Sequence, residues 1–254
     1  MKRLRQVTEA EVIAEFLKNE FYQEEFQHDR EQFEHLVLGA DVADESGNAL
    51  RRALLFRRRG HMWRELPRDT QWWEVEIESQ DLDRVRVFPR AQWRKMADGN
   101  FLLKDIVRRI RTKPFRGRTR DFIAKIQALS YQLRIHQDTS SVLLIGIDDQ
   151  KSVTVLEGNH RLTAALLASL DVLQRSFRVY CGFSEHMSES CWYQTNMPNL
   201  WRYGRNRVRN LFYDRDADVE RLMRPDSVLA IRDNEAVLSP VGAQKAATGS
   251  KRAI

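Results

Sequence analysis

The residues best equipped for chemistry are five consecutive positions near the middle of the chain, Glu157-Gly158-Asn159-His160-Arg161. An apolar segment precedes them and a helical pattern of apolar residues follows, which predicts a turn that opens a helix. Gly158 permits a tight turn with close backbone approach. The first amides of a helix lack backbone acceptors and lie at the positive end of the helix dipole, so this turn favours an anion.

The side chains of the turn suit phosphate chemistry. Arg161 can hold a phosphate through two parallel hydrogen bonds. His160 can donate a hydrogen bond to a phosphate oxygen, or act as an acid or a base near neutral pH. Glu157 can bind a magnesium ion or orient His160. The alternative is a helix start capped by Asn159, with a solvated histidine and arginine behind it.

The elements that must position this turn are predicted from hydrophobic periodicity. Apolar alternation or continuous apolar runs predict strands over residues 73–77, 142–147, 153–156 and 177–181. Apolar spacing of three to four residues predicts helices over about 102–110, 121–133 and 160–170. The two strands before the turn are joined by Asp148-Asp149-Gln150 and are predicted to form a hairpin.

The two ends of the chain differ from this middle part. The first third is predicted to be helical, with helices over about 9–21, 28–38 and 48–58. Residues 113–120 are predicted to form a basic loop. Residues 188–213 mix aromatic residues with arginines, which fits a helical lid with an aromatic core face or, less well, a surface that stacks nucleic-acid bases.

Composition limits the class of protein. The chain has 254 residues, of which 42% are hydrophobic and 31% charged, which is typical of a folded soluble protein. The net charge of +6 permits an anionic partner such as a nucleotide, a phosphorylated metabolite or a nucleic acid. No apolar run approaches the ~18 residues of a membrane span, so no membrane partner is expected. The two cysteines, Cys181 and Cys191, form no zinc motif or disulfide framework, which favours the cytoplasm.

The order of elements over about 72–183, together with the segment from Glu157 to Ala165, resembles the ParB/sulfiredoxin superfamily. The resemblance implies an α+β fold, a small mixed sheet with helices, and a Gly-x-x-Arg turn that grips nucleotide phosphates. His160-Arg161 is closest to the kinase-like branch, whose members phosphorylate a small hydroxyl with a nucleotide donor. Sulfiredoxins carry a cysteine at this turn and ParB proteins usually carry Arg-Arg, and neither is present here.

The resemblance divides the chain into four segments. They are a helical N-terminal extension over 1–70, the ParB/sulfiredoxin-like domain over 71–185, a helical C-terminal extension over 186–239 and a disordered tail over 240–254.

The function implied by the resemblance is a nucleotide-dependent phosphotransferase or nucleotide hydrolase that acts on a small molecule with ATP or another nucleoside triphosphate and Mg²⁺. Gly158, Asn159, His160 and Arg161 would bind the phosphates, His160 and Glu157 would be catalytic, and Glu157 would hold the metal.

The resemblance also implies a general base among the acids of residues 81–105. The candidates are Asp81, Asp83, Asp98 and Asp105. We prefer Asp98, because Asp98-Gly99-Asn100 breaks the helical pattern. The alternative function is a ParB-like, nucleotide-switched DNA-binding or DNA-associated protein without small-molecule catalysis, so nucleic acid stays open as a partner.

Overall fold

The computed structural model describes residues 1–224 except 98, 137, 139, 210 and 213–214. The described residues form a six-stranded mixed sheet in the order β1-β2-β6-β4-β5-β3. Its strands are β1 (Lys2–Val7), β2 (Gln71–Glu76), β3 (Val85–Val87), β4 (Ser141–Gly146), β5 (Val153–Glu157) and β6 (Arg178–Phe183). The pairs β3–β5 and β4–β6 are parallel, and the other neighbours are antiparallel, including the predicted β4–β5 hairpin.

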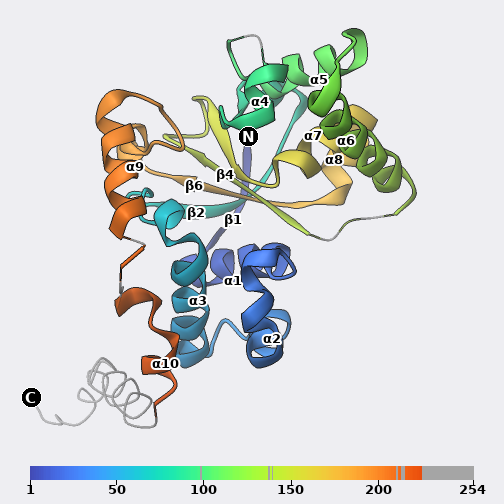
Figure 1. Cartoon of the computed structure of the whole chain (residues 1–254). Coiled ribbons are helices and arrows are strands. Elements are labelled where there is room, and N and C mark those ends of the chain that lie inside the picture. Colours follow the sequence, from blue (N-terminus) through green and yellow to red (C-terminus); the bar gives the residue numbers. More distant parts are fainter. Residues whose placement is uncertain (98, 137, 139, 210, 213–214, 225–254) are drawn as a thin grey trace, which may run out of the picture.

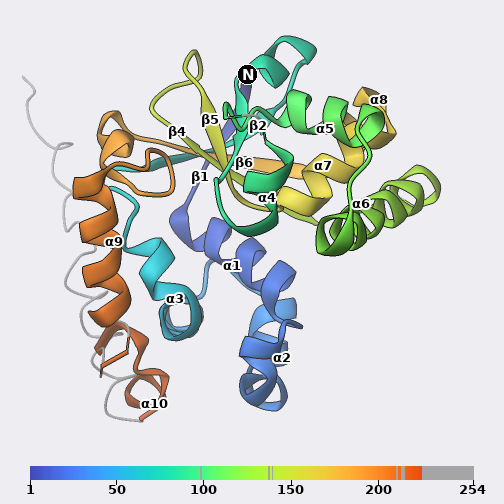
Figure 2. The same cartoon turned by 45° about the horizontal axis from the view of Figure 1, so that its top comes forward.

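Helices cover both faces of this sheet (Figures 1 and 2). One face carries α4 (Ala91–Met96), α5 (Leu103–Thr112), α6 (Gly117–Ile135), α7 (Asn159–Ala168) and α8 (Leu170–Ser176). The other face carries α1 (Glu9–Glu20), the 3₁₀ helix η1 (Glu24–Asp29), α2 (Arg30–Leu38) and α3 (Glu45–Trp63).

Strand β4 shows why two cores form. Val142 and Leu144 pack into the core under α4–α8, whereas Leu143 and Ile145 pack into the core under α1–α3. Successive side chains of a strand point to opposite faces, so a continuous apolar run fits a strand that is covered on both sides. The predicted α+β class is confirmed, with a mixed sheet and a helical N-terminal region.

Several element predictions need correction. The N-terminal region also contributes β1, in which Val7 alone is buried, so the segment lacked the alternation that predicts a strand. The predicted basic loop over 113–120 is wrong in its second half, because α6 already begins at Gly117. The third helix is longer than the 48–58 expected and runs from Glu45 to Trp63.

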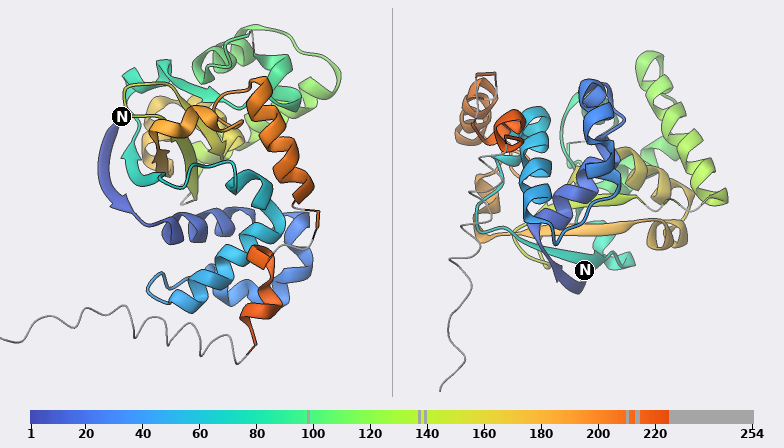
Figure 3. Two further views of the ribbon diagram at one scale, coloured as in Figure 1. Left: turned by 90° about the vertical axis from the view of Figure 1, so that its left-hand side faces the viewer. Right: turned by 90° about the horizontal axis from the view of Figure 1, so that it is seen from below.

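The C-terminal part contains the 3₁₀ helices η3 (Glu185–Glu189) and η4 (Arg215–Ala217) and the helices α9 (Met197–Arg209) and α10 (Val219–Leu222). Helix α9 lies along an outer edge of the molecule, beside α3 (Figures 1, 2 and 3). The expected aromatic core face is wrong for Trp201, which is 78% exposed. The predicted tail over 240–254 lies outside the described residues. None of the described helices is long and apolar enough to cross a membrane.

Candidate functional site

The turn between β5 and α7 has the conformation that its glycine permits. Gly158 adopts φ 90° and ψ 19°, in the left-handed region. A Cβ atom at this position would lie 3.0 Å from Cγ2 of Val142 on the neighbouring strand. Leu162 donates the first hydrogen bond of the helix to the Gly158 carbonyl at 2.9 Å. The amides of residues 159–161 therefore have no acceptor within the helix.

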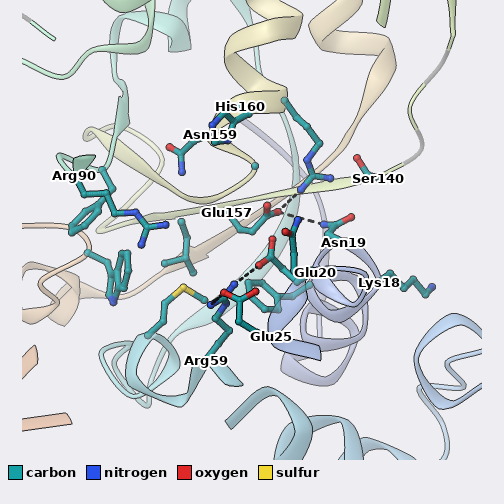
Figure 4. A pocket seen from close by; sticks show the side chains of 18 of the residues that line it. Lys18, Asn19, Glu20, Glu25, Arg59, Arg90, Ser140, Glu157, Asn159 and His160 are labelled. Carbon is teal, nitrogen blue, oxygen red and sulfur yellow. Dashed lines mark hydrogen bonds and ion pairs between the residues drawn. The ribbon is translucent and has the colours of Figure 1, made fainter. Parts of the chain in front are cut away.

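Gly158, Asn159, His160 and Arg161 line a pocket of about 680 Å³. The pocket lies beyond the carboxyl ends of the parallel strands β3 and β5, the usual position of ligands in sheets that carry parallel strands. Its other walls come from α1, η1, α3, the segment after β3 and Trp192. Figure 4 shows His160 and Asn159 on one side of this space and Glu20, Glu25 and Arg59 on the other. The volume is in the range of small-molecule sites.

Arg161 and Glu157 form an ion pair across one turn of the chain, and both side chains are largely buried. Asn19 of α1 lies 3.5 Å from the same carboxylate and donates to the Ser141 carbonyl at 2.9 Å. Burial raises the pKa of Glu157, although the charge of Arg161 opposes this shift. Because one arm of the guanidinium already binds Glu157, Arg161 can offer an anion only its remaining N–H groups.

His160 stands at the rim of the pocket, where its ring remains accessible to solvent. The ring centroid lies 4.9 Å from that of Phe122 and 5.4 Å from that of Trp93. Partial burial and the positive charges of Arg90 and Arg161 lower the pKa of His160. The neutral imidazole, which carries one donor and one acceptor nitrogen, is therefore the dominant form near pH 7.

Arg90 is a pocket residue that the sequence analysis missed. It follows β3, and its guanidinium lies 5.8 Å from the centroid of the Trp192 ring. It forms no ion pair with any acidic residue of the described chain. Its charge lowers the pKa of both His61 and His160, which line the same pocket. No local pattern distinguishes this arginine from the other basic residues of the sequence.

Helix α3 adds two further residues that sequence reasoning did not single out. Arg59 donates hydrogen bonds of 2.9 Å to both Glu20 and Glu25. Partial burial, together with the charges of Arg207 and Arg59, lowers the pKa of His61 to about 4. The wall opposite α7 thus consists of a paired arginine and a neutral histidine.

Of the four acids proposed as general base, the three that the structure describes do not line this pocket. Asp81 is buried and pairs with the Met1 amino group at 2.6 Å. Asp83 pairs with Lys104, and Asp105 pairs with Arg108 at 2.8 Å. Asp98 lies outside the described residues. The described carboxylates that do line the pocket are those of Glu20, Glu25, Asp138 and Glu157.

The fit to a magnesium ion is partial. Within the described part of the chain, no group of three or more histidine, cysteine or acidic side chains is arranged to hold a metal. Magnesium bound mainly by phosphates and water needs only one or two carboxylates. Glu157 can supply one while it keeps its contact with Arg161, and Glu20 is close enough for its charge to raise the pKa of Glu157.

Comparison with known proteins yields no relative: no protein family, no curated protein and no solved structure matches this chain.

Proposed function

We propose that the pocket at the amino end of α7 binds a nucleoside triphosphate and that the chain is a nucleotide-dependent phosphotransferase or nucleotide hydrolase acting on a small molecule. One observation carries the proposal: the first residues of α7, including His160 and Arg161, line one pocket of about 680 Å³ together with Arg90. Helix amides and an arginine that pairs with no described acidic residue favour a multiply charged anion. The resemblance to the kinase-like branch of the ParB/sulfiredoxin superfamily belongs to the same proposal.

Each residue has a role in this proposal. The amides of residues 159–161 and the guanidinium of Arg90 hold phosphate oxygens, and Arg161 adds its remaining N–H groups. Neutral His160 donates a hydrogen bond to charge that grows during phosphoryl transfer, which lowers the barrier more than it strengthens ground-state binding. A magnesium ion, held by Glu157, would neutralise charge on the phosphates.

The general base is reassigned within the pocket. An acceptor hydroxyl that enters from the α1 side meets Glu20 and Glu157. Glu20 is the general base of this proposal, because Glu157 already binds Arg161 and would hold the magnesium ion. The pocket volume of about 680 Å³ is in the range of small-molecule sites, which favours a small acceptor.

The first test is a thermal-shift screen of the whole protein against ATP, CTP, GTP and inorganic tripolyphosphate with Mg²⁺. A ligand at about 100 times its Kd should add about 2.7 kcal/mol to the unfolding free energy. Phosphate release measured with the stabilising nucleotide then separates an enzyme from a binding protein.

The second test assigns the site. Arg90→Gln should lower nucleotide affinity at least tenfold, whereas Lys95→Gln should not, because Lys95 lies on the adjacent helix and does not line the pocket. His160→Ala should lower turnover more than affinity. If no triphosphate stabilises the protein, or if the two charge variants lose affinity equally, the proposal is wrong.

A further inference from the structure

Helix α9 buries polar residues and exposes large apolar ones, which is the reverse of a typical surface helix. Its buried residues are Asn199 and Asn206, which are 5% and 8% exposed. Met197 and Trp201 are each 78% exposed and Val208 is 54% exposed. Surface helices normally bury their apolar stripe. Tyr203 packs against the core, but the exposed side chains of Met197, Trp201 and Val208 contribute little to the stability of the described fold.

Polar contacts hold the inner side of α9 in place. Asn206 donates a hydrogen bond to Glu65, which is buried at the end of α3. Asn199 donates to the carbonyls of Ser188 at 2.9 Å and Gln194 at 2.7 Å. These bonds hold the side of the helix that carries Asn199 and Asn206 against the protein, and Trp201 lies on the exposed side.

The outer side of α9 is strongly basic. The helix carries Arg202, Arg205, Arg207 and Arg209 and no acidic residue. Arg202 pairs with Glu189 at 2.9 Å, whereas Arg205 and Arg209 form no ion pair with any described residue. An exposed indole thus lies on the same helix as two arginines that lack a described acidic partner.

The basic surface continues into a second pocket, between α3 and α9, of about 540 Å³. Arg209 lines it together with Arg52, Arg64 and Arg68. Its acidic lining residues among the described positions are Glu9 and Asp216. Glu9 already pairs with Arg52 at 2.5 Å and accepts a hydrogen bond from Trp63 at 2.7 Å. Arg64, whose side chain is 8% exposed, lies 3.7 Å from Asp216, so Arg68 and Arg209 are the pocket arginines that form no ion pair with a described residue. Their charge extends the basic surface of α9 into the neighbouring pocket.

We infer that α9 and this pocket form a binding surface for single-stranded nucleic acid, with a base stacked on Trp201 and the phosphates following Arg205, Arg209 and the pocket arginines. A track of arginines suits a polymer of phosphates, and an exposed indole suits an unpaired base. A duplex is a poorer fit, because the faces of its bases are already stacked. The surface shares no lining residue with the nucleotide pocket, so the inference does not depend on the proposed function.

The test uses the whole protein and a fluorescent single strand of fifteen thymidylates, with anisotropy measured at increasing salt. Trp201→Ala should weaken binding about tenfold through the loss of one stacked base. Arg205→Gln with Arg209→Gln should weaken it further and make the slope of log K against log salt shallower by about 1.4. The matched control is Arg116→Gln with Arg118→Gln, which removes two exposed arginines near the start of α6.

Three results would overturn the inference. The first is no binding at low salt. The second is an equal loss in the two double variants, since that would reflect overall charge rather than this surface. The third is unchanged affinity in Trp201→Ala with a native melting temperature. Binding to vesicles of phosphatidylcholine and phosphatidylglycerol, or to poly-glutamate, without binding to the oligonucleotide would assign the surface to another partner and equally exclude nucleic acid.

Discussion

At Gly158 the backbone conformation and the packing both exclude a side chain. A φ of 90° costs a residue with a side chain about 1–2 kcal/mol. A Cβ atom added here would also lie only 3.0 Å from Cγ2 of Val142, whose side chain is fully buried in β4 and has little room to move. The sequence analysis predicted a tight turn here from residue type alone, and the turn is confirmed. The same constraints set the direction in which the first helical amides face the pocket.

Gly158→Ala is therefore expected to lower the unfolding free energy by about 2 kcal/mol and to weaken nucleotide binding. The measurement is urea unfolding together with calorimetric titration of the nucleotide. Gly204→Ala is the matched control, because no atom lies within 4 Å of the added Cβ and the site is helical. That control should be neutral or slightly stabilising. A Gly158→Ala protein with unchanged stability and affinity would refute the role of the turn.

His61 makes the unfolding free energy of the protein depend on pH in a predictable direction. Its pKa is lowered from 6.5 to about 4, so the unfolded state binds the proton more readily than the folded state. The contribution of neutral His61 to the unfolding free energy is therefore fully present above about pH 6.5, and it is lost as the pH falls toward 4. The loss should be on the order of 1–3 kcal/mol. His61→Gln should flatten the pH profile of the unfolding free energy in this window. An equally flattened profile in His136→Gln, at an exposed position, would contradict the assignment.

At the scale of elements, the sequence analysis succeeded where burial follows a simple period. The apolar run before the hairpin predicted β4, and the spacing after Gly158 predicted α7. The sequence did not predict β1, which is held by backbone pairing with β2 and whose side chains are exposed except that of Val7. The helix in the region of α9 was predicted, but its aromatic core face is wrong for Trp201, because α9 buries asparagines and exposes this indole.

The inner contacts of α9 lead to a prediction about how the helix is held. Asn206→Ala leaves the buried carboxyl of Glu65 without its side-chain partner, and burial already raises the pKa of that group. The expected loss of unfolding free energy is about 1–3 kcal/mol. Val208→Ala, on the exposed side of the same helix, should stay within about 0.5 kcal/mol of the parent. Similar losses in both variants would mean that the outer face of α9 is not as open as its exposure indicates.

At the scale of the whole molecule, the candidate site is assembled from segments far apart in the sequence. Asn19 reaches Ser141 and Glu157, and Arg59 reaches Glu20 and Glu25. The Asn19 contacts join α1, on one face of the sheet, to the turn that opens α7 on the other face, whereas the Arg59 contacts join α3 to α1 and η1 within one layer. Periodicity can predict each helix, but it carries no information on which side chains meet at the end of the sheet. For that reason the turn was predictable, whereas Arg90, Arg59 and His61 were not.

This assembly predicts how the proposed nucleotide will affect the dynamics of the protein. A ligand that fills this pocket contacts the helices on both faces of the sheet. Because it binds the folded site and not states in which either layer has locally unfolded, it lowers the population of those states and stabilises both layers. Hydrogen exchange of the whole protein should slow in α7 and also in α1 and at the end of α3, since Asn19, Glu20 and Arg59 line the pocket. Exchange in α10 serves as the internal control, because α10 contributes no residue to that pocket. Protection confined to the turn at 157–161 would show that the α1–α3 wall takes no part in binding, and it would restrict the site to the phosphate end alone.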